Sequence, residues 1–362
     1  MVKTLSSTLA KPRSAKAGAS ATRRSAEPRS IRAVAIGGGT GLSTLLRGLR
    51  EYVASPHPPS IECAPAPCLI SDLAAVVTVT DDGGSSGRLR RGLNMLPPGD
   101  LRNCMVALSE DEHLISRLFR HRFTAGEGLE GHSFGNLFVA ALLEMTGDFA
   151  QAIKLSSQVL ATRGHIYPVT NANVSLAARM DDGSLVHGET NITASRQRIV
   201  ELMLEPADAE PLPETLEAIE RADLITVGPG SLFTSLITNL LVKGVSEALA
   251  NARAVRVYIC NLMTQANESL NLTASQHIER IYEHAHHAIF DYALVNTAPV
   301  SKALLDRYAG EGASPIVADI KAIEALGVRC IAGDFAAEGD VVRHAADRVT
   351  EAIVRLGISG RR

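Results

Sequence analysis

The chain has 362 residues, of which 46% are hydrophobic and 21% charged, and its formal net charge is −3 at pH 7. This is ordinary globular composition, and a slightly acidic chain with no Trp and 4% aromatic residues lacks the basic surface and stacking platforms of nucleic-acid-binding proteins. No apolar run approaches the roughly 18 residues that span a bilayer. The five cysteines are odd in number and scattered, which indicates reduced thiols. We therefore expect a cytoplasmic protein with no nucleic-acid partner and no membrane span.

The first 30 residues carry seven Lys or Arg and a single acidic residue, Glu27. Their Ala and Ser content is similar to that of organelle-targeting segments, and Arg23-Arg24 suggests a twin-arginine signal, but no apolar segment follows it. We predict a disordered basic tail over residues 1–30. Residues 54–70 hold five prolines, which indicates an irregular insertion. Cys63 and Cys68 lie in it, but no second pair of zinc ligands follows them, so we interpret this stretch as a loop and not as a zinc site.

Ordered patterning begins with a short buried strand at residues 32–36, a glycine run at 37–41 and an amphipathic helix from about 42 to 53. A second strand at 74–80 ends in Asp81-Asp82-Gly83-Gly84-Ser85-Ser86-Gly87. Asp100 is predicted to be the N-cap of the next helix. Helical periodicity continues over residues 101–108, 114–119, 134–145 and 149–160.

The periodicity then changes from helical to alternating, which predicts an antiparallel insertion over about residues 165–205. Its expected strands are 165–170, 174–180, 185–190 and 199–204, with a hairpin turn at 181–184. Strands at 222–227, 255–260, 293–295 and 315–318, helices through Leu241 and Leu249, and a closing helix at 344–356 complete the pattern. Strand, loop and helix alternate, which is typical of an α/β fold with a mostly parallel sheet covered by helices on both sides.

Ligands of such sheets bind beyond the carboxyl ends of the strands. Four segments are expected there, namely residues 37–41, 81–87, 228–231 and 261–268. The run Gly37-Gly38-Gly39-Thr40-Gly41 would let backbone N–H groups and a helix N-terminus approach a phosphate, although a tight turn is the plain alternative. It lacks the Gly-Lys-Ser/Thr of a Walker A loop, and Leu42 replaces the third glycine of G-x-G-x-x-G. Gly228-Pro229-Gly230-Ser231 repeats the arrangement, with Ser231 either capping a helix or donating to a phosphate.

The segment from Asp81 to Gly87 places two carboxylates beside small residues, which suits a hydrated Mg²⁺, a ribose hydroxyl or a general base. We take Asp81 and Asp82 as metal ligands or, in an enzyme, catalytic residues, and Gly84, Ser85 and Ser86 as ligand contacts. Further ligand contacts are expected from polar residues at two helix starts and in the last loop. These are Arg102, Asn103, His132, Asn136, Asn261 and Glu268.

Two further motifs are weaker. Residues 131–135 match G-x-S-x-G by letter, but a glycine-rich loop rather than a strand precedes Ser133, which speaks against a hydrolase nucleophile. His284, His286 and His287, with His277 nearby, have no acidic or Cys partner at ligand spacing, which favours a solvated helix end over a metal site.

Five ordered motifs resemble the bacterial gluconeogenesis factor family, relatives of 2-phospho-L-lactate transferase. They are the glycine run at 37–41, Thr80-Asp81-Asp82-Gly83-Gly84-Ser85-Ser86-Gly87, Pro98-Gly99-Asp100-Leu101-Arg102-Asn103, Gly131-His132-Ser133-Phe134-Gly135-Asn136 and Gly228-Pro229-Gly230-Ser231-Leu232. Tyr258-Ile259-Cys260-Asn261-Leu262-Met263-Thr264-Gln265 follows them, and the resemblance covers residues 31–357. Where the family usually has Gly-Glu-Thr followed by an acid and a glycine, this chain has Ala266-Asn267-Glu268-Ser269-Leu270, which retains Glu268 alone.

The resemblance implies a single Rossmann-like domain and a cytoplasmic factor needed for normal cell shape during growth on gluconeogenic carbon sources. It implies a UDP-activated sugar such as UDP-N-acetylglucosamine as ligand, whereas the transferase relatives hold a guanine nucleotide, Mg²⁺ and a deazaflavin. Carried over by motif, residues 38–41 and 228–231 (Gly38, Gly39, Thr40, Gly41, Gly228, Gly230 and Ser231) would hold phosphates. Asp81 and Asp82 would serve the metal or sugar, and Asn103, His132 and Asn136 would line the cleft.

Three functions stay open at this point. The chain is either a ligand-sensing factor without turnover or a Mg²⁺-dependent transferase, with an NAD(P)-dependent oxidoreductase disfavoured by the missing third glycine. Mg²⁺ is the one cofactor expected, with no tightly bound organic cofactor. A homodimer is compatible with all three.

Overall fold

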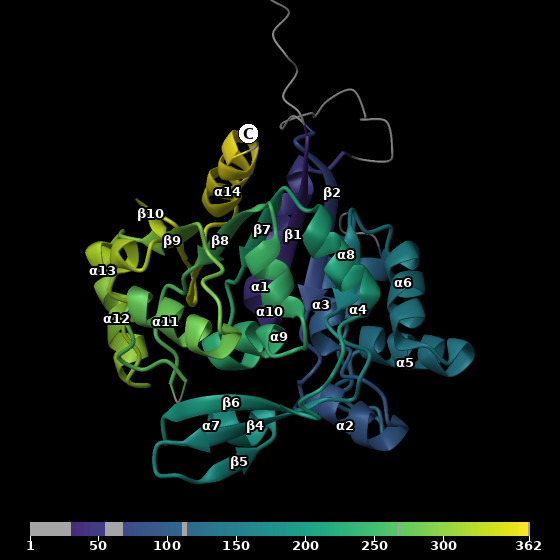
Figure 1. Ribbon diagram of the computed structural model, residues 1–362. Helices are drawn as coiled ribbons and strands as arrows, with labels where there is room; N and C mark the ends of the chain where they lie inside the picture. Colours follow the sequence, from purple (N-terminus) through teal and green to yellow (C-terminus); the bar gives the residue numbers. More distant parts are fainter. Residues whose placement is uncertain (1–29, 55–67, 111–113, 267, 361–362) are drawn as a thin grey trace, which may run out of the picture.

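The computed structural model describes residues 30–54, 68–110, 114–266 and 268–360 (Figure 1). The predicted tail over residues 1–29 and the proline-rich residues 55–67, with Cys63, lie outside the described residues. Cys68, at the edge of that insertion, is an exposed free thiol.

The core is a seven-stranded sheet in the order β10-β9-β8-β7-β1-β2-β3. Every neighbouring pair in it is parallel. The strands are β1 (Ile31–Gly37), β2 (Ile70–Val77), β3 (His165–Pro168), β7 (Leu224–Val227), β8 (Val255–Ile259), β9 (Tyr292–Asn296) and β10 (Arg329–Gly333). The chain moves outward from β1 to β2 and β3, returns to β7 on the other side of β1, and continues to β10. The strand order therefore reverses between β1 and β7, the position at which Rossmann-like folds bind ligands.

Helices cover both faces of this sheet, as expected, so that β1 and β7 are almost wholly buried. On one face α1 (Gly39–Leu49) packs against α3 (Gly99–Leu108) and α14 (Ala346–Gly360), and on the other α8 (Pro213–Arg221) packs against α10 (Val245–Asn251) (Figure 1). Gly48 makes the contact between α1 and α14 close, because a Cβ there would lie 2.9 Å from the Ala346 carbonyl oxygen.

The predicted insertion is a three-stranded antiparallel sheet in the order β5-β4-β6, beside the carboxyl ends of the main strands in Figure 1. It consists of β4 (Ser175–Met180), β5 (Leu185–His187) and β6 (Ile199–Glu205), with α7 (Glu189–Ala194) in place of the last part of a predicted strand. Its predicted start at residue 165 was wrong, because β3 pairs in parallel with β2. An edge strand with one exposed face alternates like an antiparallel strand, so periodicity does not separate the two.

Several other boundaries differ from the predictions. Helix α1 begins at Gly39 rather than Leu42, and α3 begins at Gly99 with Pro98 as N-cap, so Asp100 lies in its first turn. The predicted strand at 315–318 is a single bridge between Met263 and Pro315. The remaining elements are η1 (Arg50–Tyr52), α2 (Gly84–Leu93), α4 (Leu114–Arg120), α5 (Phe134–Thr146), α6 (Phe149–Val159), the π-helical η2 (Leu232–Ile237), α9 (Thr238–Leu240), α11 (Ala274–Ala285), α12 (Lys302–Ala309), α13 (Ile320–Ala325), β11 (Ala336–Glu338) and β12 (Val342–His344).

Within the described part of the chain, no single helix is long and apolar enough to cross a membrane. Among the described helices, one bent pair, Leu232–Leu240 and Val245–Asn251, reaches that length and composition together, across a 78° bend.

Candidate ligand-binding site

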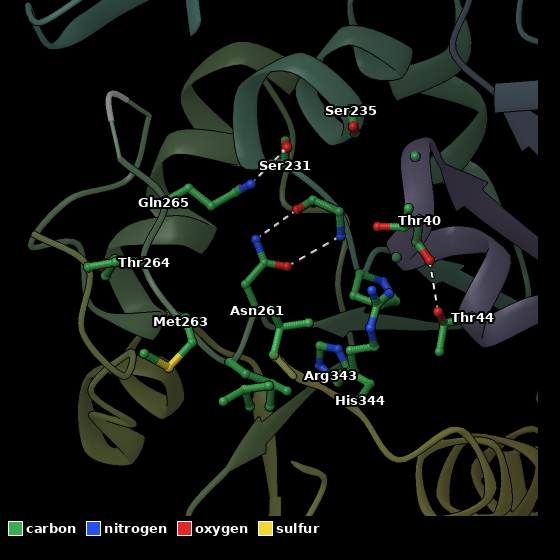
Figure 2. A pocket seen from close by; sticks show the side chains of 18 of the residues that line it. Thr40, Thr44, Ser231, Ser235, Asn261, Met263, Thr264, Gln265, Arg343 and His344 are labelled. Carbon is green, nitrogen blue, oxygen red and sulfur yellow. Dashed lines mark hydrogen bonds between the residues drawn. The ribbon is translucent and has the colours of Figure 1, made fainter. Parts of the chain in front are cut away.

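A cavity of about 480 Å³ opens at the carboxyl ends of β1, β7 and β8, where the strand order reverses (Figure 2). Three loops predicted to bind ligand line it, at residues 38–41, 229–231 and 261–266. Residues 341–344 of the β11–β12 hairpin and residues 308–313, at and after the end of α12, complete the lining. Five separate parts of the chain therefore meet around one space.

The first wall is the N-terminus of α1, with its glycine run as the first helical turn. Asp100 reaches across from α3, and its Oδ2 accepts a hydrogen bond of 2.7 Å from the Gly39 N–H. Burial raises the pKa of the Asp100 carboxyl to about 6. A Cβ at Gly38 would lie 2.7 Å from Thr78 Cγ2 and 2.9 Å from Asp100 Oδ2, so only glycine fits. No described side chain caps the other N–H groups of this turn, which leaves them available to an anion from the cavity.

The second wall is the loop after β7, which Asn261 holds in place. Asn261 Oδ1 accepts from the Gly230 N–H at 3.2 Å and Asn261 Nδ2 donates to the Gly230 carbonyl at 2.7 Å (Figure 2). Asn261 thus lines the cavity, but both ends of its amide are used to fix the loop. The two glycine-rich loops touch at Gly41, where a Cβ would lie 2.4 Å from the Pro229 carbonyl oxygen.

The hairpin supplies the positive charge of the cavity. Among the described residues that line it, Arg343 is the only Arg or Lys and Glu311 the only Asp or Glu. The neighbouring His344 donates from Nε2 to the Cys260 carbonyl at 3.0 Å, and burial lowers its pKa to about 4. Sequence reasoning missed Arg343 because it belongs to no motif, and only the folded sheet brings β12 to the loop after β1.

Two residues of the predicted site, Glu268 and Gly228, do not line the cavity but contact the segments that form its walls. Glu268 is not among the lining residues, and its buried carboxylate accepts from Thr234 Oγ1 at 2.9 Å and from the Phe233 N–H at 3.4 Å. Burial raises its pKa. Gly228 has a φ of 90° and a Cβ there would lie 2.8 Å from the Ile259 carbonyl oxygen, so its role is in the turn itself.

Three other predicted contacts come together in a separate cluster. Asn136 Nδ2 donates to Ser85 Oγ at 3.1 Å, and Ser85 Oγ lies 2.9 Å from His132 Nδ1. Ser133 Oγ accepts from the Asn136 N–H at 3.2 Å as the N-cap of α5, which explains the G-x-S-x-G match without a nucleophile. Gly84 and Ser85 line a more open hollow against residues 125–131. None of these residues lines the cavity of Figure 2.

The last predicted contacts lie on α2 and α3. Arg102 Nη2 donates to Asn103 Oδ1 at 2.7 Å, and burial lowers the pKa of the Arg102 guanidinium. Ser86 is buried against α3, where a Cβ at Gly99 would lie 2.4 Å from its Oγ. The structure brings these side chains near Asp81, because that same Cβ would lie 3.2 Å from Asp81 Oδ2.

The paired carboxylates have different surroundings. Asp82 Oδ1 accepts from both the N–H, at 2.9 Å, and the hydroxyl, at 2.5 Å, of Thr190, and so caps α7. Asp81 Oδ1 accepts from the Gly83 N–H at 2.9 Å. No group of three His, Cys, Asp or Glu among the described residues could hold a metal. Mg²⁺ commonly binds one or two protein carboxylates together with water and ligand phosphates, which fits Asp81 better than the pair.

Because Asp82 caps α7 and Asp81 does not, substitution of Asp82 should lower stability and substitution of Asp81 should not. We expect Asp82→Ala to lower the free energy of unfolding by about 1 kcal/mol, because α7 loses its cap, and to speed amide hydrogen exchange in residues 175–205. Asp81→Ala should keep the wild-type stability and lose only the Mg²⁺-dependent part of nucleotide binding. Equal exchange rates in wild type and Asp82→Ala would show that the cap does not hold the insertion.

The histidines near the end of α11 are not the solvated group predicted from the sequence. His277 is fully buried with its Nδ1 3.0 Å from the Tyr258 hydroxyl, and burial lowers its pKa to about 4. His284 Nδ1 donates to the Arg280 carbonyl at 2.7 Å, and its Nε2 accepts from the Leu202 N–H at 3.1 Å. Only His286 of these is exposed. Tyr258 and Leu202 come from other elements, and spacing along one helix does not reveal such partners.

Comparison with known proteins agrees with the motifs. A family model described as 2-phospho-L-lactate transferase CofD matches residues 33–336. A Halalkalibacterium halodurans protein named gluconeogenesis factor is 47% identical over 322 residues, which cover 89% of this chain and 95% of that protein. The gluconeogenesis factor of Bacillus subtilis is 44% identical over 321 residues, which cover 88% and 96%. A crystal structure of a Bacillus halodurans protein matches with a TM-score of 0.83 at 46% identity, covering 90% of this chain and 100% of that one.

The resemblance stated from the sequence is therefore confirmed. The chain belongs to the 2-phospho-L-lactate transferase CofD family and, within it, to the gluconeogenesis factors.

Proposed function

We propose that this gluconeogenesis factor is a cytoplasmic protein that binds a nucleotide-sugar of the UDP-N-acetylglucosamine type and supports normal cell shape during gluconeogenic growth. The observation that carries the proposal is the N-terminus of α1, whose N–H groups after Gly39 have no described side-chain partner and which lines one cavity together with the loop of residues 229–231 and Arg343. Backbone N–H groups at a helix N-terminus and a guanidinium are favourable partners for a diphosphate. The cavity volume of about 480 Å³ lies within the range of small-molecule sites, roughly 300–1,000 Å³.

The composition of the cavity favours binding over catalysis. Its described lining contains no Cys, Lys or Asp, and its one histidine, His344, donates to a carbonyl and has a pKa of about 4. An imidazole that is neutral at pH 7 and already donates its N–H to a backbone carbonyl is a poor general acid or base. Leu262, Met263 and Val341 add apolar surface for the part of the ligand beyond the phosphates. We therefore favour a ligand-sensing factor without turnover.

The alternative function is a Mg²⁺-dependent transferase of the phospholactate type that uses a nucleotide-diphosphate-linked donor. The family match over residues 33–336 supports it, as does Asp81 near the carboxyl end of β2. It predicts Mg²⁺-dependent consumption of a deazaflavin acceptor, whereas the sensing function predicts binding with no product.

Calorimetric titration tests the proposal. UDP-N-acetylglucosamine, GDP and NADP are titrated with and without Mg²⁺ into wild type, Arg343→Ala and the control Arg355→Ala on the exposed surface of α14. We expect UDP-N-acetylglucosamine to bind most tightly and Arg343→Ala to bind it at least tenfold more weakly, because a charge-assisted contact is lost. Arg355→Ala should match wild type. Wild-type protein that binds no nucleotide, or equal affinity in both variants, would reject the proposed site.

A further inference from the structure

The wall of the cavity formed by the loop after β8 contains an amide that contacts Ser231. Gln265 Nε2 lies 3.0 Å from Ser231 Oγ, and both residues line the cavity (Figure 2). Two hydrogen bonds to Ser269 hold the backbone that carries this amide. The Gln265 N–H donates to Ser269 Oγ at 3.0 Å, and the Gln265 carbonyl accepts from the Ser269 N–H at 3.1 Å. Ser269 itself is fully buried. Gln265 therefore approaches Ser231 from a fixed position.

The hydrogen-bonding capacity of the two side chains decides where the serine proton points. Gln265 Oε1 is buried and has no partner among the described residues. If the amide were turned around, its NH₂ group would be buried there instead, which would strand two donors rather than one acceptor. The amide N–H therefore donates to Ser231 Oγ, and the hydroxyl proton of Ser231 points away from Gln265. Because Ser231 lines the cavity, that proton is available to a ligand oxygen.

This arrangement is costly for the fold. A buried carbonyl oxygen without a partner destabilises the folded state, and an apolar side chain of the same length would avoid that cost. A residue whose task was stability would satisfy both ends of its amide, as Asn261 does on Gly230. The unsatisfied acceptor thus indicates that the donation to Ser231 serves the ligand.

We propose that Gln265 is a positioning residue, which turns the hydroxyl of Ser231 into a hydrogen-bond donor for a phosphate oxygen of a nucleoside diphosphate in the cavity. The inference rests on the proposed function and adds to it the residue that sets the direction of one contact. Ser231 makes the contact, and Gln265 acts only through Ser231. The two side chains should therefore behave as one unit.

A double-mutant cycle tests this. Binding of UDP and of UDP-N-acetylglucosamine is measured for wild type, Ser231→Ala, Gln265→Met and the double variant, with thermal unfolding of each. We expect either single substitution to weaken both ligands about tenfold, as for one lost hydrogen bond to a charged group. The double variant should be no weaker than Ser231→Ala, because Gln265 has no effect without its serine. Gln158→Met, on the exposed surface of α6, is the matched control.

The unfolding data separate positioning from a structural role. If Gln265 only stabilised the loop, Gln265→Met would lower the unfolding temperature and weaken binding in the Ser231→Ala background as well. We expect instead an unfolding temperature equal to or above that of wild type. A double variant about a hundredfold weaker than wild type, or Gln265→Met with wild-type affinity, would overturn the assignment while the proposed function stood. Wild-type protein that bound neither ligand would remove both.

Discussion

Gly41→Ala is expected to weaken nucleotide-sugar binding about a hundredfold. The added Cβ would lie 2.4 Å from the Pro229 carbonyl oxygen and 2.8 Å from the Pro229 carbonyl carbon, so the loop after β1 and the loop after β7 must move apart. Both loops present backbone groups to the same phosphates in the proposed site, and a displacement of about 1 Å is enough for a loss of that size. The measurement is calorimetric titration with UDP-N-acetylglucosamine.

Gly92→Ala is the matched control for this substitution. Gly92 lies in α2 with nothing within 4 Å of its added Cβ, so alanine should raise the free energy of unfolding by about 0.5–1 kcal/mol and leave affinity unchanged. Gly41→Ala should instead lower the free energy of unfolding by about 1–3 kcal/mol through overpacking. Wild-type affinity in Gly41→Ala would show that contact between the two loops is not needed for binding.

Glu189→Gln should change how stability depends on pH between about 5 and 8, because the wild type should lose stability relative to this variant as the pH rises. Glu189 Oε2 accepts from Thr80 Oγ1 at 2.9 Å, next to Asp81 and Asp100. Burial, with the negative charges of Asp81 and Asp100, raises its pKa from 4.5 to about 8. At Glu189 the folded state therefore binds more proton than the unfolded state between these values, so the contribution of this side chain to stability is lost as the pH rises through this window.

We expect the difference in the free energy of unfolding between wild type and Glu189→Gln to change by about 3 kcal/mol over this range, from a shift of this direction and size. Asp100, whose pKa is raised to about 6, and His277 and His344, whose pKa values are lowered to about 4, also titrate differently in the folded and unfolded states. They do so in both proteins, so their effects cancel in the difference. Urea unfolding at a series of pH values measures it, with Glu279→Gln on the exposed side of α11 as control. A Glu189→Gln profile that ran parallel to wild type would place the responsible group elsewhere.

Much of the fold follows from the sequence because its signals are local. The buried strand at 32–36 and the glycine run after it identify β1 and the turn into α1, and the strands ending near Val227 and Ile259 were equally clear. Since parallel strands end at one edge of their sheet, the convergence of residues 38–41, 229–231 and 261–266 on one cavity could be predicted without a structure.

The roles of individual side chains were harder to predict, because they depend on partners distant in the sequence. Asp100 looked like the N-cap of its own helix, but its carboxylate serves Gly39 at the start of α1. Asp82 caps α7 in the insertion, and Glu268 lies behind the cavity against η2. A carboxylate at a helix start or strand end has the same local signature whether it binds a ligand or another helix. Only the tertiary structure distinguishes these roles.

The two sides of the cavity come from opposite parts of the sequence, with residues 38–41 on one side and 341–344 on the other. During synthesis on the ribosome the glycine-rich turn emerges early, but the hairpin that bears Arg343 emerges after all seven strands of the main sheet. A nascent chain consequently has no complete cavity until the hairpin has left the exit tunnel. In the proposed function, ligand therefore stabilises only chains from which the hairpin has emerged, after the strands of the central sheet.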